Sequence, residues 1–385
     1  MNRLDPRTVA VRAGLESDAT TGAVVPPIHL SSTYAFPSFG VKGKYDYSRS
    51  GNPTRDLLGE AVRELEGGAG AVITASGMAA IALIGQVLPR GSRVVAPHDC
   101  YGGTFRLFNA WHKRGDFAVE FVDYGNADAL RASLSIPAAL VWVETPSNPL
   151  LRITDIRAVA AAAKAVGALI VVDNTFMSPV LQQPLQLGAD VVVHSTTKYL
   201  NGHSDVVGGA VVAASEDLHQ QFAWWANALG MTGAAFDSFL TLRGIRTLHA
   251  RMALHESNAV ALASHLATAP GVRKVYYPGL STHPGHVLAK TQQSGFGAML
   301  SIELDGGVPA VERFVGALEL FSLAESLGGV ESLIAHPATM THAAMEPAAR
   351  AAAGLVDGLL RLSIGIEAIE DLRADLDSGL AALRR

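Results

Sequence analysis

Six short apolar runs alternate with helical segments along the first half of the chain. The runs lie at 71–76, 93–96, 118–123, 138–144, 168–173 and 190–194. They are mostly continuous β-branched residues, which is typical of strands buried on both faces of a parallel sheet. Apolar residues recur at helical spacing between them, at 78–88, 103–114 and 155–167. This order predicts an α/β fold in which helices cover a mostly parallel sheet.

The pattern changes on both sides of this region. Residues 1–60 are rich in Pro, Gly, Ser and Tyr, and we expect an ordered arm that ends in a loop at 44–55 and a helix starting near Thr54. A long helix is predicted at 243–268. Short strands at 297–304 and 359–367 and a helix at 308–318 then indicate a smaller α+β domain. We therefore predict an arm at 1–60, a large domain at 61–255 and a C-terminal domain at 256–385.

Composition excludes several classes of function. The 385 residues carry a net charge of −5, which gives no support for binding nucleic acid or an anionic membrane. Cys100 is the only cysteine, so an intrachain disulfide or a cysteine zinc cluster is excluded. His283 and His286 lie close in sequence without an obvious third ligand, and we expect no metal site. No apolar stretch approaches the ~18 residues of a membrane span, and the N-terminus lacks a signal-peptide core. We expect a soluble, cytoplasmic protein.

Polar residues follow the predicted strands, where parallel α/β sheets bind ligands. Lys198 comes directly after the strand at 190–194, and partial desolvation there would make its amine a nucleophile able to form a Schiff base. Asp173 ends the strand at 168–173 and could hold a pyridinium N–H. A solvent-facing lysine and a capping aspartate are the structural alternatives.

Three further features suit a phosphate, a flat cofactor and a carboxylate. Ser76-Gly77-Met78 opens a helix and could cradle a dianion, with hydroxyl donors from Ser195 and Thr197. Tyr101 lies in a glycine turn and could stack on a ring. Strand alternation places Arg361 beside small residues, where it could bind a carboxylate. Common helix caps, a packing tyrosine and an exposed strand arginine are the alternatives.

Motifs along nearly the whole chain resemble the Cys/Met-metabolism family of pyridoxal phosphate (PLP) enzymes. They include SRSGNPTR (48–55), ETPSNP (144–149), VVDNTF (171–176), HSTTKYLNGHSD (194–205) and LAESLGGVESL (323–333). The resemblance implies PLP fold type I and a homotetramer built of active dimers. By motif position it implies that Lys198 carries PLP, that Tyr101 stacks on the ring, and that Asp173 holds the pyridine nitrogen. We expect nearby cationic groups to lower the pKa of Tyr101, so that its phenolate acts as a second base. The other implied cofactor contacts are Asn148 at the ring hydroxyl, Gly77, Met78, Ser195 and Thr197 at the phosphate, and Tyr47 and Arg49 from the neighbouring subunit.

The resemblance also implies a reaction. Segments at 96–103, 223–230 and 233–244 are most similar to bacterial members that join O-succinyl-L-homoserine to L-cysteine, giving L-cystathionine and succinate. Members that cleave cystathionine at Cγ are the second possibility. The implied substrate contacts are Arg361, Ser326 and Asn148 at the α-carboxylate and Glu325, which both groups share; Arg106 and Asn227 are our own candidates for the distal carboxylate.

Two other classes of protein are the alternatives to such an enzyme. Ser195 and Lys198 formally match the S-x-x-K motif of serine acyl-enzymes, but the accompanying K-T-G and S-D-N motifs are missing. A catalytically inactive binding protein of the same fold is expected to have lost Lys198 or Asp173, and the chain has both.

Overall fold

The structure, a computed structural model, describes residues 4–343, 350–351 and 353–384. The chain forms two compact units. The first unit comprises residues 1–89 and 171–249, and the second comprises residues 90–170 and 250–385. The three-part division expected from the sequence stays a prediction.

A seven-stranded sheet dominates the first half of the chain. Its strands are β1 (Gly70–Thr74), β2 (Arg93–Pro97), β3 (Ala118–Val122), β4 (Leu140–Glu144), β5 (Leu169–Asp173), β6 (Val191–Ser195) and β7 (Gly209–Ala213). The strand order is β1-β7-β6-β5-β4-β2-β3. Strands β2, β3 and β4 pair in parallel, as do β5 and β6, whereas β7 runs antiparallel to β1 and β6. The predicted α/β fold with a mostly parallel sheet is confirmed.

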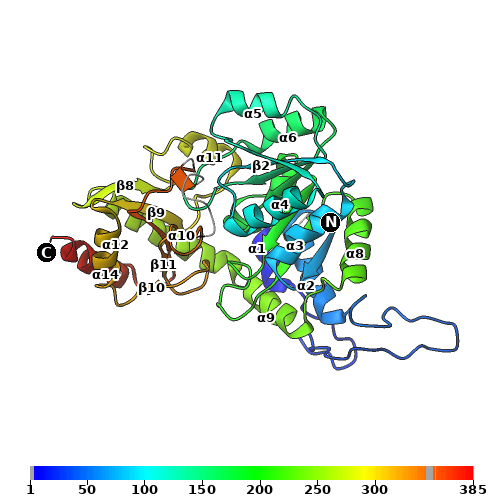
Figure 1. Cartoon of the computed structure of the whole chain (residues 1–385). Helices are drawn as coiled ribbons and strands as arrows, with labels where there is room; N and C mark the ends of the chain where they lie inside the picture. The colour runs from blue at the N-terminus through cyan, green and yellow to red at the C-terminus, as the bar shows by residue number, and fades with distance from the viewer. Residues whose placement is uncertain (1–3, 344–349, 352, 385) are drawn as a thin grey trace. The chain divides into compact units, whose positions relative to one another are not determined.

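Helices occupy most of the intervals between these strands (Figure 1). Those of the first unit are α1 (Pro6–Arg12), α2 (Pro53–Glu66), α3 (Gly77–Ile84), η1 (Gly85–Val87), α7 (Ser178–Leu181), η2 (Pro184–Leu187), α8 (Glu216–Leu229) and α9 (Ala235–Ile245). Those of the second unit are α4 (Gly102–Arg114), α5 (Ala127–Ser133), α6 (Ile156–Ala165), α11 (His286–Gln292), α12 (Gly307–Val315) and α14 (Ile369–Ala382). Helix α10 (Leu248–Leu266) begins in the first unit and continues in the second.

Helix α2 illustrates how local sequence sets the boundaries of an element. The Asn52 side chain accepts the N–H groups of Thr54 and Arg55 at 3.0 and 3.2 Å, and Pro53 occupies the first helical position. Gly67 ends the helix with φ of 75°, a conformation that favours glycine. The predicted helix start near Thr54 is confirmed.

The helix predicted at 243–268 is wrong as a single element, because α9 ends at Ile245 and α10 begins at Leu248. The Thr247 N–H and hydroxyl both donate to the Gly244 carbonyl at 3.1 Å, which turns the chain between the two helices. Gly244 also packs closely, since a Cβ there would lie 2.2 Å from the Asn201 carbonyl oxygen. The break therefore comes from a local cap and a close approach that apolar spacing does not reveal.

A smaller sheet lies within the second unit. Its strands are β8 (Val272–Tyr276), β9 (Met299–Leu304), β10 (Ser322–Leu323), β11 (Leu333–Ala335) and β12 (Leu359–Ser363), in the order β10-β11-β12-β9-β8. Only the β10–β11 pair is parallel among its described pairs. Strand β12 stops at Ser363 rather than continuing to 367, and all five of its residues are buried.

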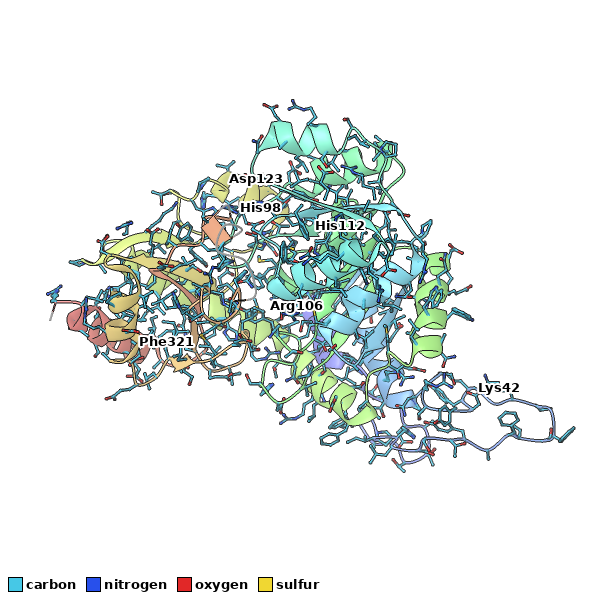
Figure 2. The ribbon with its side chains drawn as sticks, in the orientation of Figure 1. Lys42, His98, Arg106, His112, Asp123 and Phe321 are labelled. Atoms are coloured by element: carbon cyan, nitrogen blue, oxygen red, sulfur yellow. The ribbon has the colours of Figure 1, made fainter. Side chains whose placement is uncertain are left out.

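The arm before α2 is largely irregular. Between α1 and α2 the described chain forms only two isolated bridges, Thr33 with Tyr47 and Ser38 with Val41. Figure 1 shows this blue segment extending from the first unit as a long loop. Phe39 is fully exposed and Leu30 is 73% exposed. Lys42, which Figure 2 labels on this loop, forms an ion pair with Asp46 at 2.8 Å. None of the described helices has the length and apolar character that a bilayer span requires.

Candidate functional site

The ends of β5 and β6 bring together two of the residues predicted to contact a cofactor. The strands are parallel neighbours, with Asp173 beside Val193. The Asp173 carboxylate accepts the Thr175 N–H at 2.9 Å, and the Thr175 hydroxyl oxygen accepts the Ser195 N–H at 2.9 Å. Thr175 therefore links the two strand ends through its backbone N–H and its hydroxyl oxygen.

The start of α3 packs against the end of β6. The Ser76 hydroxyl oxygen caps the helix by accepting the Ala79 N–H at 3.0 Å. A Cβ on Gly77 would lie 2.8 Å from the Ser195 Cβ, so this contact requires glycine. Among the described residues, the N–H groups of Gly77 and Met78 have no protein acceptor. A helix start with open N–H donors beside a serine is suited to bind an anion.

Lys198 lies in the turn that follows β6. Its N–H donates to the Ser195 carbonyl at 3.3 Å, and its own carbonyl accepts the Gly202 N–H at 2.8 Å. The side chain is half-buried. The neighbouring Thr197 hydroxyl accepts the Gly208 N–H at 3.0 Å and donates to the Gly208 carbonyl at 3.3 Å. The turn therefore sets Lys198 three residues beyond Ser195, next to the strand-end cluster.

The electrostatics of this strand-end cluster suit a cationic ring bearing a phosphate. Burial raises the pKa of Asp173, and the hydrogen bonds from Thr175 offset part of that shift. No ion pair involving Asp173 occurs within the described ranges. A pyridinium N–H would supply the missing partner, and the open donors of α3 would meet a phosphate. The residues of the first unit therefore fit PLP.

Tyr101 is held at the start of α4 in the second unit. A buried carboxylate, that of Glu144 at the end of β4, accepts the Tyr101 N–H at 2.7 Å and the Thr104 hydroxyl at 3.1 Å. The same carboxylate accepts the Trp142 indole N–H at 3.0 Å. Glu144 therefore fixes the chain at the start of α4, where Tyr101 is 41% exposed.

The Tyr101 phenol differs from the sequence expectation in one respect. We expected nearby cations to lower its pKa and favour a phenolate base. Burial instead raises the pKa of Tyr101 and outweighs the opposite influence of Arg106 and Arg361, while Glu325 and Glu144 add to the increase. The expected lowering is therefore wrong for the residues described. These influences nevertheless place Arg106, Glu325 and Arg361 in the electrostatic surroundings of Tyr101.

Arg361 forms a second polar centre in the same unit. It is 3% exposed on β12, and its guanidinium donates to the Asn148 side-chain oxygen at 3.2 Å and to the Ser326 carbonyl at 2.7 Å. Asn148 directly follows Ser147, which donates to the buried Asp99 carboxylate at 2.9 Å. The partly exposed Arg152 also donates to Asp99, at 2.7 Å. The structure thus brings together the three residues predicted at the substrate carboxylate.

Three more of the predicted residues, Tyr47, Arg49 and Asn227, lie together in the first unit. Arg49 donates to the Asn227 carbonyl at 2.8 Å, and its guanidinium lies 5.7 Å from the centre of the Tyr47 ring. Arg49 and Asn227 line a cavity of about 580 Å³ in the first unit. Arg106 is exposed on α4 (Figure 2). No hydrogen bond in the described chain joins Tyr47 or Arg49 to Asp173 or Ser195.

Sequence reasoning missed two buried acids, Glu66 and Glu144, that organise these centres. Glu144 accepts the Tyr101 N–H. Glu66 of α2 joins His194 and Asn174 through hydrogen bonds of 2.6 and 2.8 Å. One signal was available for each. Glu144 ends a continuous apolar run, and Glu66 directly follows the apolar face of α2, positions where an unpaired carboxylate is unfavourable. Within the described residues, no cluster of three or more potential ligands is placed to hold a metal ion.

Comparisons with known proteins agree with these features. The family model described as "Cys/Met metabolism PLP-dependent enzyme" matches residues 7–381. The chain is 59% identical to cystathionine gamma-synthase from Escherichia coli over 98% of both chains. It is 48% identical to cystathionine beta-lyase from Coxiella burnetii over 97% of both, and relatives named cystathionine gamma-lyase are also more distant than the synthase.

A solved structure extends the similarity to three dimensions. Cystathionine gamma synthase from Xanthomonas oryzae pv. oryzae, in complex with aminoacrylate and cysteine, matches with a TM-score of 0.98. Its sequence identity is 63%, and 99% of each chain is covered. The match confirms the predicted fold type. The chain therefore belongs to the Cys/Met-metabolism family of PLP-dependent enzymes.

Proposed function

We propose that this chain is a cystathionine γ-synthase, which joins O-succinyl-L-homoserine to L-cysteine and yields L-cystathionine and succinate, a step of transsulfuration in methionine biosynthesis. The observation that carries the proposal is the similarity to synthases, at 59% and 63% identity over almost the whole chain. The succinyl ester is the finer part of the proposal and rests on the motifs at 96–103, 223–230 and 233–244.

The first unit supplies the cofactor contacts in this proposal. Bound PLP would act as the electron sink that makes protons at the substrate Cα and Cβ acidic. Lys198 would hold PLP through its amine and would move protons at the substrate Cα and Cβ. Asp173 accepts the pyridine N–H. The phosphate is bound by the N–H groups of Gly77 and Met78 and the hydroxyls of Ser195 and Thr197.

The second unit supplies contacts to the ring and the substrate. Tyr101 stacks on the ring and is a candidate second base, and Asn148 contacts the ring hydroxyl. Arg361, held by Asn148 and Ser326, binds the α-carboxylate. Glu325, Arg106 and Asn227 are further candidates for contacts with the substrate. In the net reaction the Cγ–O bond breaks, succinate leaves with the electron pair, and the cysteine sulfur forms the new bond to Cγ after losing its proton.

The arm and the assembly belong to the same proposal. Tyr47 and Arg49 bind the phosphate of a neighbouring subunit, within a homotetramer of active dimers. The exposure of the arm supports this role, since Tyr47 itself is 48% exposed. The arm at 1–60, the PLP-binding domain at 61–255, the domain at 256–385 and the cytoplasmic location remain predictions from the sequence.

One steady-state comparison tests the proposal. The enzyme is given O-succinylhomoserine with cysteine in one assay and cystathionine alone in the other, and all products are quantified. We expect fast formation of cystathionine and succinate and slow breakdown of cystathionine. Faster release of 2-oxobutanoate from cystathionine would identify a γ-lyase, and faster release of pyruvate would identify a β-lyase.

A further inference from the structure

A buried carboxylate lies beneath the strand ends of the first unit. Glu66, at the last position of α2, is 0% exposed. One of its oxygens, Oε1, lies 2.6 Å from His194 Nε2 and accepts the Asn174 side-chain N–H at 2.8 Å. Asn174 also exchanges two hydrogen bonds with Gln182, at 2.8 and 3.0 Å. The network therefore consists of fully or almost fully buried side chains from α2, β6 and the segment after β5.

The two residues that Glu66 holds are immediate neighbours of proposed cofactor contacts. Asn174 follows Asp173, and His194 precedes Ser195. Successive side chains of a strand point to opposite faces, so His194 and Ser195 lie on opposite faces of β6. The parallel pairing places Asp173 beside Val193, two residues before Ser195 and on the same face. Glu66 thus binds the ends of β5 and β6 through Asn174 and His194, on the face opposite the proposed cofactor contacts.

The bonding of the network is uneven. Both donors converge on Oε1, while Glu66 Oε2 and His194 Nδ1 are buried without a hydrogen-bond partner among the described residues. Leaving buried polar atoms unpaired is unfavourable, and apolar side chains in the same space would avoid it. Filling space in the core therefore does not explain why Glu66 and His194 are polar. Fixing the relative position of the two strand ends does explain it.

We propose that Glu66 is a positioning residue for PLP, which sets the distance between Asp173 and Ser195 by holding Asn174 and His194 from the opposite face. The inference rests on the proposed cofactor contacts of Asp173 and Ser195. It assigns Glu66 no contact with PLP or substrate.

The test uses the full-length enzyme and PLP alone. The PLP dissociation constant of the apoenzyme and the visible circular dichroism of the bound cofactor are measured for wild type, Glu66→Ala and Glu66→Gln. Glu66→Ala removes the acceptor from both strand ends, so we expect PLP affinity to fall about tenfold to a hundredfold and the dichroism band to change. Glu66→Gln keeps an acceptor oxygen in the same place, so it is expected to restore both properties close to wild type.

A buried carboxylate elsewhere provides the matched control. Glu303 is 8% exposed on β9 and bonds to Arg273 and Tyr276 in the second unit. Glu303→Ala is expected to lower the melting temperature of the apoenzyme without changing PLP affinity or the dichroism band. If Glu66→Ala behaves like Glu303→Ala, its role is structural and the inference is wrong. Equal loss of affinity in Glu66→Gln and Glu66→Ala would also overturn it, because the acceptor would then not be the cause.

Two additional variants keep the test decisive. If Glu66→Ala does not fold, Asn174→Ala removes one of the two links, and unchanged PLP affinity with unchanged dichroism would contradict the inference. Asp173→Ala separately measures how much the proposed contact to the pyridine nitrogen contributes to PLP affinity. These readouts need no substrate, so they are independent of whether the enzyme is a synthase or a lyase.

Discussion

At the scale of single residues, Tyr101 shows how neighbouring charges oppose one another around one functional group. Partial burial raises the pKa of its phenol, Arg106 and Arg361 lower it, and Glu325 and Glu144 raise it. Glu144 also fixes the Tyr101 backbone through a 2.7 Å hydrogen bond. Removing a charge is therefore expected to move the phenol pKa in a direction that depends only on the sign removed.

We predict that Arg106→Ala raises the pKa of Tyr101 and that Glu325→Gln lowers it, because the first removes a cation and the second an anion near the phenol. Ultraviolet titration of phenolate formation measures both shifts. The titration of each protein is compared with the same protein carrying Tyr101→Phe, which isolates Tyr101 from the other tyrosines. Shifts of the same sign in the two variants would contradict the electrostatic explanation.

Arg106 is also the residue that we predict to give specificity for the succinyl ester. If it binds the succinyl carboxylate, Arg106→Ala loses a charge-assisted contact of about 1.5–3 kcal/mol, which corresponds to roughly tenfold to a hundredfold in binding. We expect a much larger increase in KM for O-succinylhomoserine than for its acetyl counterpart, which lacks that carboxylate. Arg361→Ala should impair both substrates alike. Equal effects of Arg106→Ala on the two esters would exclude Arg106 and leave Asn227 as the named candidate.

The sequence could indicate the functional residues that lie at or just after the end of a predicted strand. Lys198 and Asp173 each follow or end a continuous apolar run, and the structure places Asp173 and Ser195 at adjacent strand ends. Glu66 could not be found in this way, because its partners His194 and Asn174 lie more than a hundred residues away in sequence. Long-range hydrogen bonds of this kind depend on the packing of α2 beneath the sheet.

At the scale of elements, the end of β12 is fixed from α10 by buried polar side chains. His255 is 0% exposed and its Nδ1 lies 2.6 Å from the Ile364 carbonyl oxygen. Asn258, one turn further along α10, donates to the Gly365 and Glu367 carbonyls at 3.1 and 2.9 Å. These contacts hold the chain directly after the strand that carries Arg361.

The burial of His255 predicts that acid lowers the stability of the folded protein. Burial lowers the pKa of His255 from 6.5 to about 4, so the folded protein favours the neutral ring. The unfolded chain binds the proton more readily, and stability present above pH 6.5 is lost as the pH falls toward 4, by on the order of 3 kcal/mol. Thermal unfolding of wild type and His255→Gln between pH 7.5 and 4.5 tests this. The variant should lose less stability on acidification, and an unchanged pH dependence would exclude His255 as a contributor.

Elements were predictable where their sequence pattern was long and uniform. The strands from β1 to β6 were anticipated from continuous apolar runs. Strand β7, with the sequence GAVVA, was missed because it is short and begins with glycine. Strand β12 was expected to extend to 367 with one polar face, yet it ends at Ser363 and is buried on both faces. The second sheet encloses that strand, and this tertiary burial overrides the local alternation.

At the scale of the whole molecule, the arm exposes large apolar side chains that no other part of the described chain covers. Leu30 and Phe39 expose 73% and all of their side-chain surface, respectively, and Tyr47 is 48% exposed. Large apolar side chains gathered on one irregular segment favour a surface that another subunit covers. The proposed sharing of Tyr47 and Arg49 between subunits accounts for both the exposure and the polar groups of this segment.

Subunit mixing tests this proposal. Lys198→Ala and Arg49→Ala are each expected to be nearly inactive as pure proteins. A mixed dimer would contain one site in which both Lys198 and the partner's Arg49 are intact, so activity should recover after the two proteins exchange subunits. Exchange is verified independently with differently tagged chains. Exchange without recovered activity would show that Arg49 does not complete a neighbouring site.

The claim on which the other roles depend is that Lys198 carries PLP. Reduction of the yellow holoenzyme with borohydride, followed by peptide mapping, measures this attachment directly. We predict a single modified lysine, Lys198, and loss of covalent attachment together with an activity decrease of orders of magnitude in Lys198→Ala. Modification of a different lysine, or of none, would contradict the proposed site.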